Sequence, residues 1–290
     1  MIELLQTDIL QRALIAAVLI GLCAPAVGTF IVQRRLALLG DGIGHIALTG
    51  VALGFLTQTA PVITAVIVSV AGAIVIELVR ARGRTSGDVA LALLFYGGIA
   101  GGVMLMSISP GGSSTKLNSY LFGAIALVSD QDLWIIGGLA VAVIGVVLVF
   151  GRELFVLCQD EEMAKASGLP VRMLSMIIAV TAALTVVIAM RVVGLLLVSA
   201  LMVIPVATGQ QFTRGFRATM ALAMVFGVLA AVGGLLGSTV STRVPPGAAI
   251  VLVALAGFVA ALGVGRFVRR GRTREPAVSR RPSIRMEEVS

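Results

Sequence analysis

A carboxylate and an imidazole lie four residues apart in an otherwise apolar stretch of the chain. Asp41 precedes His45, which is the only histidine in the sequence. If the stretch is helical, positions i and i+4 lie one above the other on the same face. Carboxylate oxygens and imidazole nitrogens are both ligands for divalent transition metals. Because ionisable groups in a membrane segment are costly and usually functional, the pair predicts a metal site at membrane depth.

The alternative interpretation of this pair is a hydrogen bond between Asp41 and His45 that only pins two helices together. A transport site must release its ion, and two features suit that need. Gly42 and Gly44 flank the pair and lower the rigidity of a helix. His45 must be neutral to bind a metal, so binding should weaken at acid pH.

The composition places these residues in a membrane protein. Hydrophobic residues make up 58% of the 290 positions, charged residues 12%, and the mean hydropathy is +1.07. The net charge of +8 does not indicate a nucleic-acid partner, because it is concentrated at one end. From Arg266 onward, eight arginines oppose three acids, which accounts for five of the eight charges. The composition of this segment predicts a basic, disordered tail that lies near anionic lipid.

Nine apolar stretches are long enough to cross a bilayer, which takes about 17–25 residues. They are residues 9–31, 36–58, 60–79, 89–109, 132–150, 171–190, 192–211, 217–238 and 247–267. With the C-terminus inside, 18 Lys and Arg residues fall on the cytoplasmic side and four outside. The positive-inside rule therefore predicts an N-out, C-in orientation. Because the joint at Arg191 is very short, 171–211 can also be one bent or re-entrant element, and eight spans is the alternative.

The predicted fold is thus an all-α, polytopic transmembrane helical bundle of nine or eight spans, over residues 1–268. The basic cytoplasmic tail occupies residues 269–290. Between spans, residues 117–124 are apolar but too short to cross, which predicts a short helix at the pore mouth or the interface. Glu77 lies one turn before Arg80 near a span end, which predicts a snorkelling ion pair.

A second informative stretch lies between two spans on the predicted cytoplasmic side. Acids at its start, among them Glu161 and Glu162, suit a helix N-terminus, and Gly168 followed by Pro170 suits a helix stop. A short helix over 160–168 is expected. Because Ala164 and Ala166 give it a small face, it suits docking into a groove of another protein. A capped loop helix without a partner is the alternative.

The segment from Gly194 to Pro205, with Ser199 between them, carries a third signal. Proline in a transmembrane helix kinks it and frees a carbonyl. Either a gate or hinge for alternating access or a simple packing kink explains this pattern.

Four stretches now carry a family resemblance. They are residues 39–45 (Leu-Gly-Asp-Gly-Ile-Gly-His), 121–123 (Leu-Phe-Gly, before Asp130 and Asp132), 162–170 (Glu-Met-Ala-Lys-Ala-Ser-Gly-Leu-Pro) and 193–207 (Val-Gly-Leu-Leu-Leu-Val-Ser-Ala-Leu-Met-Val-Ile-Pro-Val-Ala). Over about residues 5–268 the chain resembles the integral membrane permeases of zinc/manganese ABC importers, a branch of the type II importer architecture. The family often has Ala-Leu-Ser-His after the aspartate, where this chain has Gly-Ile-Gly-His.

The resemblance implies a homodimeric permease in the plasma (inner) membrane of a bacterial-type cell. Two copies would form one pore, each docked on a cytoplasmic ABC ATPase subunit, and an extracytoplasmic metal-binding protein would deliver the ion. By this likeness, Asp41 and His45 are the pore ligands, and the helix at 160–168 is the coupling helix, with Glu161, Glu162, Ala164 and Gly168 as its coupling residues. Two copies would supply two nitrogens and two carboxylates, a set for four-coordinate zinc or part of one for six-coordinate manganese.

The chain itself is expected to be a transport subunit without enzyme activity. Its only lysines are Lys116 and Lys165, and neither closes a phosphate-binding loop of the Walker A type. ATP hydrolysis would then belong to a partner. The metal is a transported substrate rather than a bound cofactor, with zinc ranked first and manganese or ferrous iron open.

Two other functions compete with this one. A secondary metal transporter driven by an ion gradient usually needs several intramembrane carboxylates, whereas Asp41 is almost alone. A metal-dependent intramembrane hydrolase needs about three protein ligands and a general base in one chain. The single histidine and the lack of a second carboxylate near it in the sequence argue against this function.

Overall fold

The protein is all helical throughout the part that the computed structural model describes. That part covers residues 8–81, 87–109, 119–123, 130–191, 193–239 and 244–272. The helices are α2 (Asp8–Gln33), α3 (Leu39–Leu56), α4 (Pro61–Ala81), α5 (Gly87–Ile108), α7 (Asp130–Gln159), α8 (Glu161–Ala166), α9 (Val171–Met190), α10 (Leu195–Phe212), α11 (Phe216–Ser238) and α12 (Pro246–Arg272). Residues 119–122 form a further short helical segment.

The predicted membrane bundle is confirmed, and the number of spans is the lower of the two considered. By length and composition, eight of the described helices can cross a membrane: α2, α3, α4, α5, α7, α9, α11 and α12. The predicted span at 192–211 corresponds to α10, whose apolar part, Leu197–Phe212, is shorter than the others. A break after α9 causes this shortening, because Gly194 takes a left-handed φ of 89° and caps α10.

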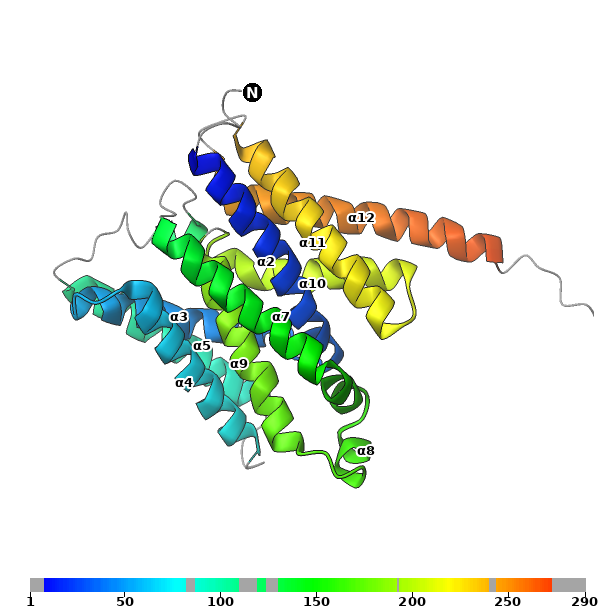
Figure 1. Cartoon of the computed structure of the whole chain (residues 1–290), viewed down its shortest axis with the longest axis horizontal. Helices are drawn as coiled ribbons and strands as arrows, with labels where there is room; N and C mark the ends of the chain where they lie inside the picture. Colours follow the sequence, from blue (N-terminus) through cyan, green and yellow to red (C-terminus); the bar gives the residue numbers. More distant parts are fainter. Residues whose placement is uncertain are drawn as a thin grey trace, which may run out of the picture.

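Helices α2, α3 and α9 form the centre of the bundle. About 72% of the most apolar window of α2 and of α9 is buried, against 22% for α7. Helix α9 packs against α2, α3, α4, α7 and α10. In Figure 1 it runs between the α3–α4–α5 group and the strongly tilted α2. The peripheral helices therefore present apolar faces to lipid, while the central helices hold the polar residues that a pathway needs.

Helix α3 is enclosed by four other helices. It packs against α5, α4, α9 and α10. Small residues permit this close packing: a Cβ added at Gly50 would lie 2.7 Å from the Cα of Ala65 on α4. Small side chains at helix contacts allow backbones to approach closely in membranes. The helix that carries Asp41 and His45 is thus held on several sides.

The turn between α2 and α3 is short and held by several backbone hydrogen bonds. The Leu36 amide donates to the carbonyl of Ile31 at 2.9 Å, and the Leu39 amide donates to that of Leu36 at 2.8 Å. Arg35 occupies a left-handed conformation with φ 59°. The turn therefore reverses the chain within five residues and delivers it directly into the first turn of α3.

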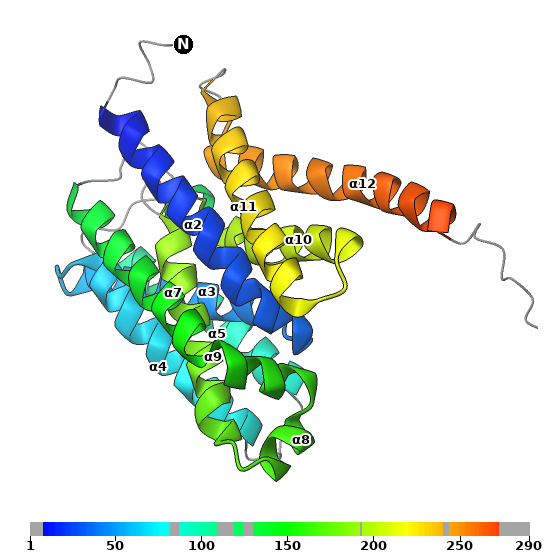
Figure 2. The same cartoon turned by 45° about the vertical axis from the view of Figure 1, so that its right-hand side comes forward.

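Helices α11 and α12 complete the other side of the molecule. Gly227 of α11 lies so close to α2 that an added Cβ would meet the Gly21 carbonyl oxygen and the Pro25 ring. Figure 2 shows α12 leaving this packed pair at a steep angle. Helix α12 continues to Arg272, so the predicted domain boundary at 268 falls inside it. Residues 273–290, most of the predicted tail, lie outside the described residues.

Candidate functional site

Helix α3 holds Asp41 and His45 on one face. Asp41 lies in the first turn of the helix, which continues without a break to Leu56. The two side chains are therefore one helical turn apart, as their spacing predicts. Asp41 is half-buried, whereas His45 is only 9% exposed. The structure thus places a half-buried carboxylate in the first turn of a membrane helix and a buried imidazole one turn further along.

The His45 ring is held mainly by contacts with α5. The Phe95 ring meets it edge-on, with the centroids 4.5 Å apart. The backbone of Gly98 is so near that an added Cβ would lie 2.7 Å from the His45 carbonyl carbon. One turn further along α3, the Thr49 hydroxyl donates to the Gly98 carbonyl at 2.9 Å. Packing rather than hydrogen bonding therefore fixes the imidazole.

The Nδ1 atom of His45 is buried without a hydrogen-bond partner among the residues that the structure describes. Metal-binding histidines usually donate their second ring N–H to a carboxylate or carbonyl, which raises their basicity. No described residue provides such a partner for His45. No group of three or more His, Cys, Asp or Glu side chains gathers within the described part of the chain. One chain alone therefore offers an incomplete coordination set.

Helix α10 brings one of the predicted gate residues next to this site. A Cβ added at Gly40, directly before Asp41, would lie 3.5 Å from the Cβ of Ser199. Pro205 lies inside α10, which continues past it to Phe212. The structure thus places Ser199 of α10 beside the start of α3. Gly194 caps the start of α10, and Pro205 lies in its interior.

Gly194 lies at a crowded joint between α9 and α10. Its φ of 89° strains any other residue. An added Cβ would also collide with the backbone of Phe122 and Gly123, part of the Leu-Phe-Gly stretch. A Cβ at Gly247, at the start of α12, would collide with the Val193 carbonyl. Three distant segments therefore meet at this joint, and only glycine fits at their contacts.

A polar cluster that the sequence did not predict fixes the same joint. Arg191, at the end of α9, forms an ion pair with Asp132 at the start of α7. It also donates to the Tyr120 hydroxyl at 3.1 Å, and its guanidinium lies 5.5 Å from the centroid of that ring. The only available signal was that Arg191 interrupts an apolar run and that Asp132 follows the Leu-Phe-Gly stretch.

The short helix expected at 160–168 is present as α8, with both ends capped. The Asp160 carboxylate accepts hydrogen bonds from the amides of Glu162 and Met163 at 2.8 and 3.0 Å. At the other end, the Leu169 amide donates to the Ala164 carbonyl, and Gly168 follows with φ 76°. This is the Schellman arrangement, in which a left-handed glycine ends the helix.

The small face of α8 is directed inward. Ala164 is 0% exposed and belongs to the core of the chain itself. Ala164, which was expected to belong to the docking face, is instead the buried position of α8 and packs on the bundle. The exposed residues of the segment are Glu161, Glu162, Met163, Lys165, Ala166, Ser167 and Gly168.

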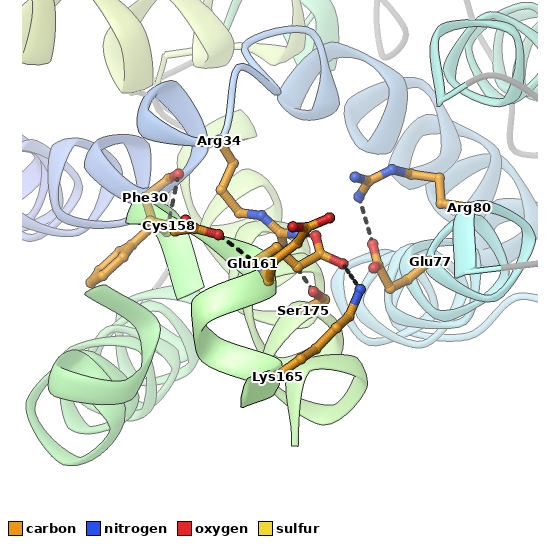
Figure 3. Close-up of polar contacts among 10 residues, drawn as sticks. Phe30, Arg34, Glu77, Arg80, Cys158, Glu161, Lys165 and Ser175 are labelled. Atoms are coloured by element: carbon orange, nitrogen blue, oxygen red, sulfur yellow. Dashed lines mark hydrogen bonds and ion pairs between the residues drawn. The ribbon is translucent and has the colours of Figure 1, made fainter. Parts of the chain in front are cut away.

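A buried arginine ties α8 to the membrane helices (Figure 3). Arg34, at the end of α2, donates to the Ser175 hydroxyl on α9 at 2.7 Å and to the Glu161 carboxylate at 3.1 Å. Its side chain is 8% exposed. Lys165 pairs with the other Glu161 oxygen at 2.9 Å. The pKa of Glu161 is lowered, first by its hydrogen bond with Lys165 and then by the nearby positive charges of Lys165 and Arg34.

The ion pair expected between Glu77 and Arg80 is confirmed, with 2.7 Å between carboxylate and guanidinium.

Together these observations define a membrane transport protein with a buried donor pair and a capped, anchored helix between spans. The chain belongs to the ABC 3 transport family, whose profile matches residues 6–265.

Relatives and a solved structure agree with this assignment. The chain is 36% identical over 252 residues to the manganese transport system membrane protein MntC of Halalkalibacterium halodurans, covering 87% of this chain and 86% of that protein. It is 35% identical over 230 residues to the manganese import system permease protein ScaB of Streptococcus parasanguinis, covering 79% and 81%. The structure of PsaBC from Streptococcus pneumoniae in complex with Fab matches with a TM-score of 0.82 and 32% identity, covering 92% of this chain and 97% of that one. The protein is therefore a permease of a metal ABC importer.

Proposed function

We propose that the chain conducts a divalent transition metal, with Mn²⁺ as the main cargo, and that Asp41 and His45 bind the ion during its passage. The observation that carries this proposal is the pairing of the two donors on one face of the enclosed helix α3. A carboxylate and an imidazole at membrane depth have a cost that a transport site explains.

The choice of manganese over zinc is supported by the relatives, which are named for manganese transport. The ranking of zinc first from the sequence gains no support from them. The donor chemistry allows both, since carboxylate suits Mn²⁺ and imidazole suits either metal. A site with few, weakly supported ligands favours release of the ion over tight retention, whichever metal it is.

The complete coordination set would come from two copies of the chain. Each copy offers one carboxylate and one imidazole, and a two-fold arrangement doubles both. A homodimeric pore in the plasma membrane, oriented N-out and C-in, would place α8 in the cytoplasm. An extracytoplasmic metal-binding protein would deliver the ion at the opposite side.

Helix α8 would couple the permease to an ABC ATPase subunit. Its exposed residues, among them Glu162 and Met163, would face the ATPase, while Ala164 and Glu161 anchor the helix to the bundle. Gly168 ends the helix and so fixes the direction of the chain after it. Movement of α8 would reach Arg34, which lies seven residues before Asp41.

Helix α10 would serve as the gate. Gly194 sets its start, Ser199 lies beside Gly40 at the start of the ligand helix, and Pro205 leaves one carbonyl in the helix without its usual donor. A small rotation of α10 would therefore change the surroundings of Asp41. The alternative of a secondary transporter is less well supported, because the chain belongs to the ABC 3 transport family. In addition, two carboxylates in its helices, Glu77 and Asp132, are engaged in ion pairs.

Uptake of radioactive Mn²⁺ into proteoliposomes tests the assignment. The liposomes would contain the permease with its ATPase, and the binding protein would be added outside. Asp41→Ala and His45→Ala should each abolish uptake while leaving complex assembly intact. Thr57→Ala, at the far end of α3, is the matched control and should transport normally. Wild-type uptake of both Mn²⁺ and Zn²⁺ by either ligand variant, at equal abundance, would remove the pair from the pathway.

A further inference from the structure

A cavity of about 400 Å³ lies between α2, α4, α8 and α9, at the end of the bundle where α8 is anchored. Basic and acidic side chains dominate its lining. They are Arg34, Arg80, Lys165 and Arg172 on the basic side, and Glu77 and Glu161 on the acidic side. The cavity takes no part in the metal pathway proposed above.

The charges in this cavity do not balance. Glu161 is shared between Arg34 and Lys165, and Glu77 pairs with Arg80. Arg172 is exposed and makes no ion pair with any residue in the described ranges. Four cations against two carboxylates give the cavity lining a net charge of +2. A cavity with this surplus attracts an anion that can accept several hydrogen bonds, such as a phosphate group.

The neighbourhood of the cavity is apolar on the side of α4. Ile63, Ile67, Val75 and Leu78 are exposed and follow one another along that helix at intervals of about one or two turns. The series ends near Ala81, which lines the cavity. An apolar stripe that leads up to a phosphate-sized basic cavity matches the two parts of a phospholipid, acyl chain and headgroup.

We propose that the cavity binds the phosphate headgroup of an anionic phospholipid whose acyl chains lie along the exposed face of α4. Basic pockets between transmembrane helices bind such headgroups in this way. A free phosphate ion shares the headgroup chemistry but makes no use of the apolar stripe. An acidic segment of a protein partner would not contact the apolar stripe either. The stripe therefore favours a phospholipid over a free phosphate ion and over an acidic protein segment.

A bound headgroup would act on α8. Lys165 belongs to α8, Arg80 to α4 and Arg172 to α9, and Figure 3 shows the Glu77–Arg80 pair beside the Arg34–Glu161–Lys165 group. A phosphate between these cations bridges α8 to two membrane helices. Anionic lipid should therefore steady the coupling helix, whichever metal the permease carries.

Native mass spectrometry of the purified full-length permease tests this site. The protein is exchanged into mixed micelles that contain phosphatidylglycerol or cardiolipin, with phosphatidylcholine as the neutral probe. Wild-type protein should retain the anionic lipids and release phosphatidylcholine. Lys165→Ala and Arg172→Ala, both exposed positions that should fold, should each weaken retention about fivefold. Arg217→Ala, which removes an exposed arginine outside the cavity, is the control and should bind as wild type.

Three results would overturn the proposal. Equal retention of anionic lipid by the Lys165→Ala/Arg172→Ala double variant and wild type would place the lipid elsewhere. Displacement of the lipid by millimolar inorganic phosphate would indicate a free-anion site. Release of phosphatidylglycerol and cardiolipin as readily as phosphatidylcholine by the wild-type permease would show that the cavity holds no anionic lipid. Metal uptake by Asp41 and His45 variants is a separate measurement, so either proposal can fail alone.

Discussion

Arg191 and Asp132 form an ion pair that joins the end of α9 to the start of α7. Tyr120, from the segment between α5 and α7, adds its hydroxyl to the same guanidinium. The pair lies next to Gly194, the position at which the chain breaks before α10. The joint that shortens α10 is therefore held in place by side chains from both neighbouring segments.

Removing one partner of this pair should destabilise the protein more than removing both. Asp132→Ala leaves the arginine largely buried without its carboxylate, which costs about 3 kcal/mol. Replacing both residues, as in Asp132→Ala with Arg191→Met, should restore part of the loss. Thermal unfolding in detergent measures the difference. Equal midpoints for the single and double variants would show that the pair contributes no coupling at this joint.

Two adjacent glycines on α5 provide a matched test of the proposed metal site. An alanine at Gly98 would press on the His45 backbone, whereas the space around Gly97 is open within 4 Å. Gly98→Ala should displace the imidazole and reduce Mn²⁺ uptake at least about tenfold, because small misplacements of functional groups are costly. Gly97→Ala should transport as wild type. Similar uptake by the two variants would mean that α5 does not position the ligand.

Helix α8 offers a second matched pair. Ala164→Leu inserts a larger side chain into a filled site of the core and should destabilise the docked helix by about 1–3 kcal/mol. Ala166→Leu places the same side chain on an exposed position of the same helix. Protease sensitivity of the 159–170 segment reports the docking. If both variants are cleaved as slowly as wild type, Ala164 is not the anchor that its burial suggests.

Gly168 should tolerate replacement poorly, although it has room for a side chain. No atom lies within 4 Å of an added Cβ, but its φ of 76° costs a non-glycine residue about 1 kcal/mol or more. Gly168→Ala should therefore lower the melting temperature. Gly237→Ala, in the last turn of α11 and equally open, should leave it unchanged or raise it slightly. Opposite signs for the two shifts are the expected signature.

The anchoring of α8 should depend on pH at the acid end. The pKa of Glu161 lies below its ordinary value of 4.5 in the folded protein, mainly through its hydrogen bond with Lys165. The ionised carboxylate therefore stabilises the fold above pH 4.5, and this contribution disappears as the pH falls through the lowered pKa. Protection of the α8 amides from hydrogen exchange should drop in that range. Glu161→Gln should remove the pH dependence; its persistence would assign the effect to another group.

Local signals in the sequence were sufficient to locate most of the helices and both caps of α8, although the break before α10 and the end of α12 differ from the predicted bounds. The apolar runs, Asp160 before α8 and Gly168 after it, each act on their own neighbourhood and can be interpreted from a few residues. The spacing of Asp41 and His45 was informative for the same reason, because a helix converts a four-residue interval into one face.

Contacts between distant segments could not be derived in this way. Nothing near Ala164 indicates which side of α8 faces the bundle, and a two-turn helix has small residues on more than one side. The ion pair between Asp132 and Arg191 joins positions 59 residues apart. Similarly, the close approach of Gly98 to His45 depends on how α5 lies against α3, which is a property of packing and not of local pattern.

The turn between α2 and α3 determines how motion at α8 can spread. Arg34 holds Glu161 and Ser175 at the start of this turn, and α3 begins at Leu39 with Asp41 two residues later. Backbone hydrogen bonds hold the chain between these points, among them those from the amides of Leu36 and Leu39. A displacement of Arg34 must therefore either break these bonds or tilt the first turn of α3. The turn therefore acts as a rigid connection between α8 and the start of α3. A displacement of α8 is expected to reorient the Asp41 carboxylate before it moves the rest of the bundle.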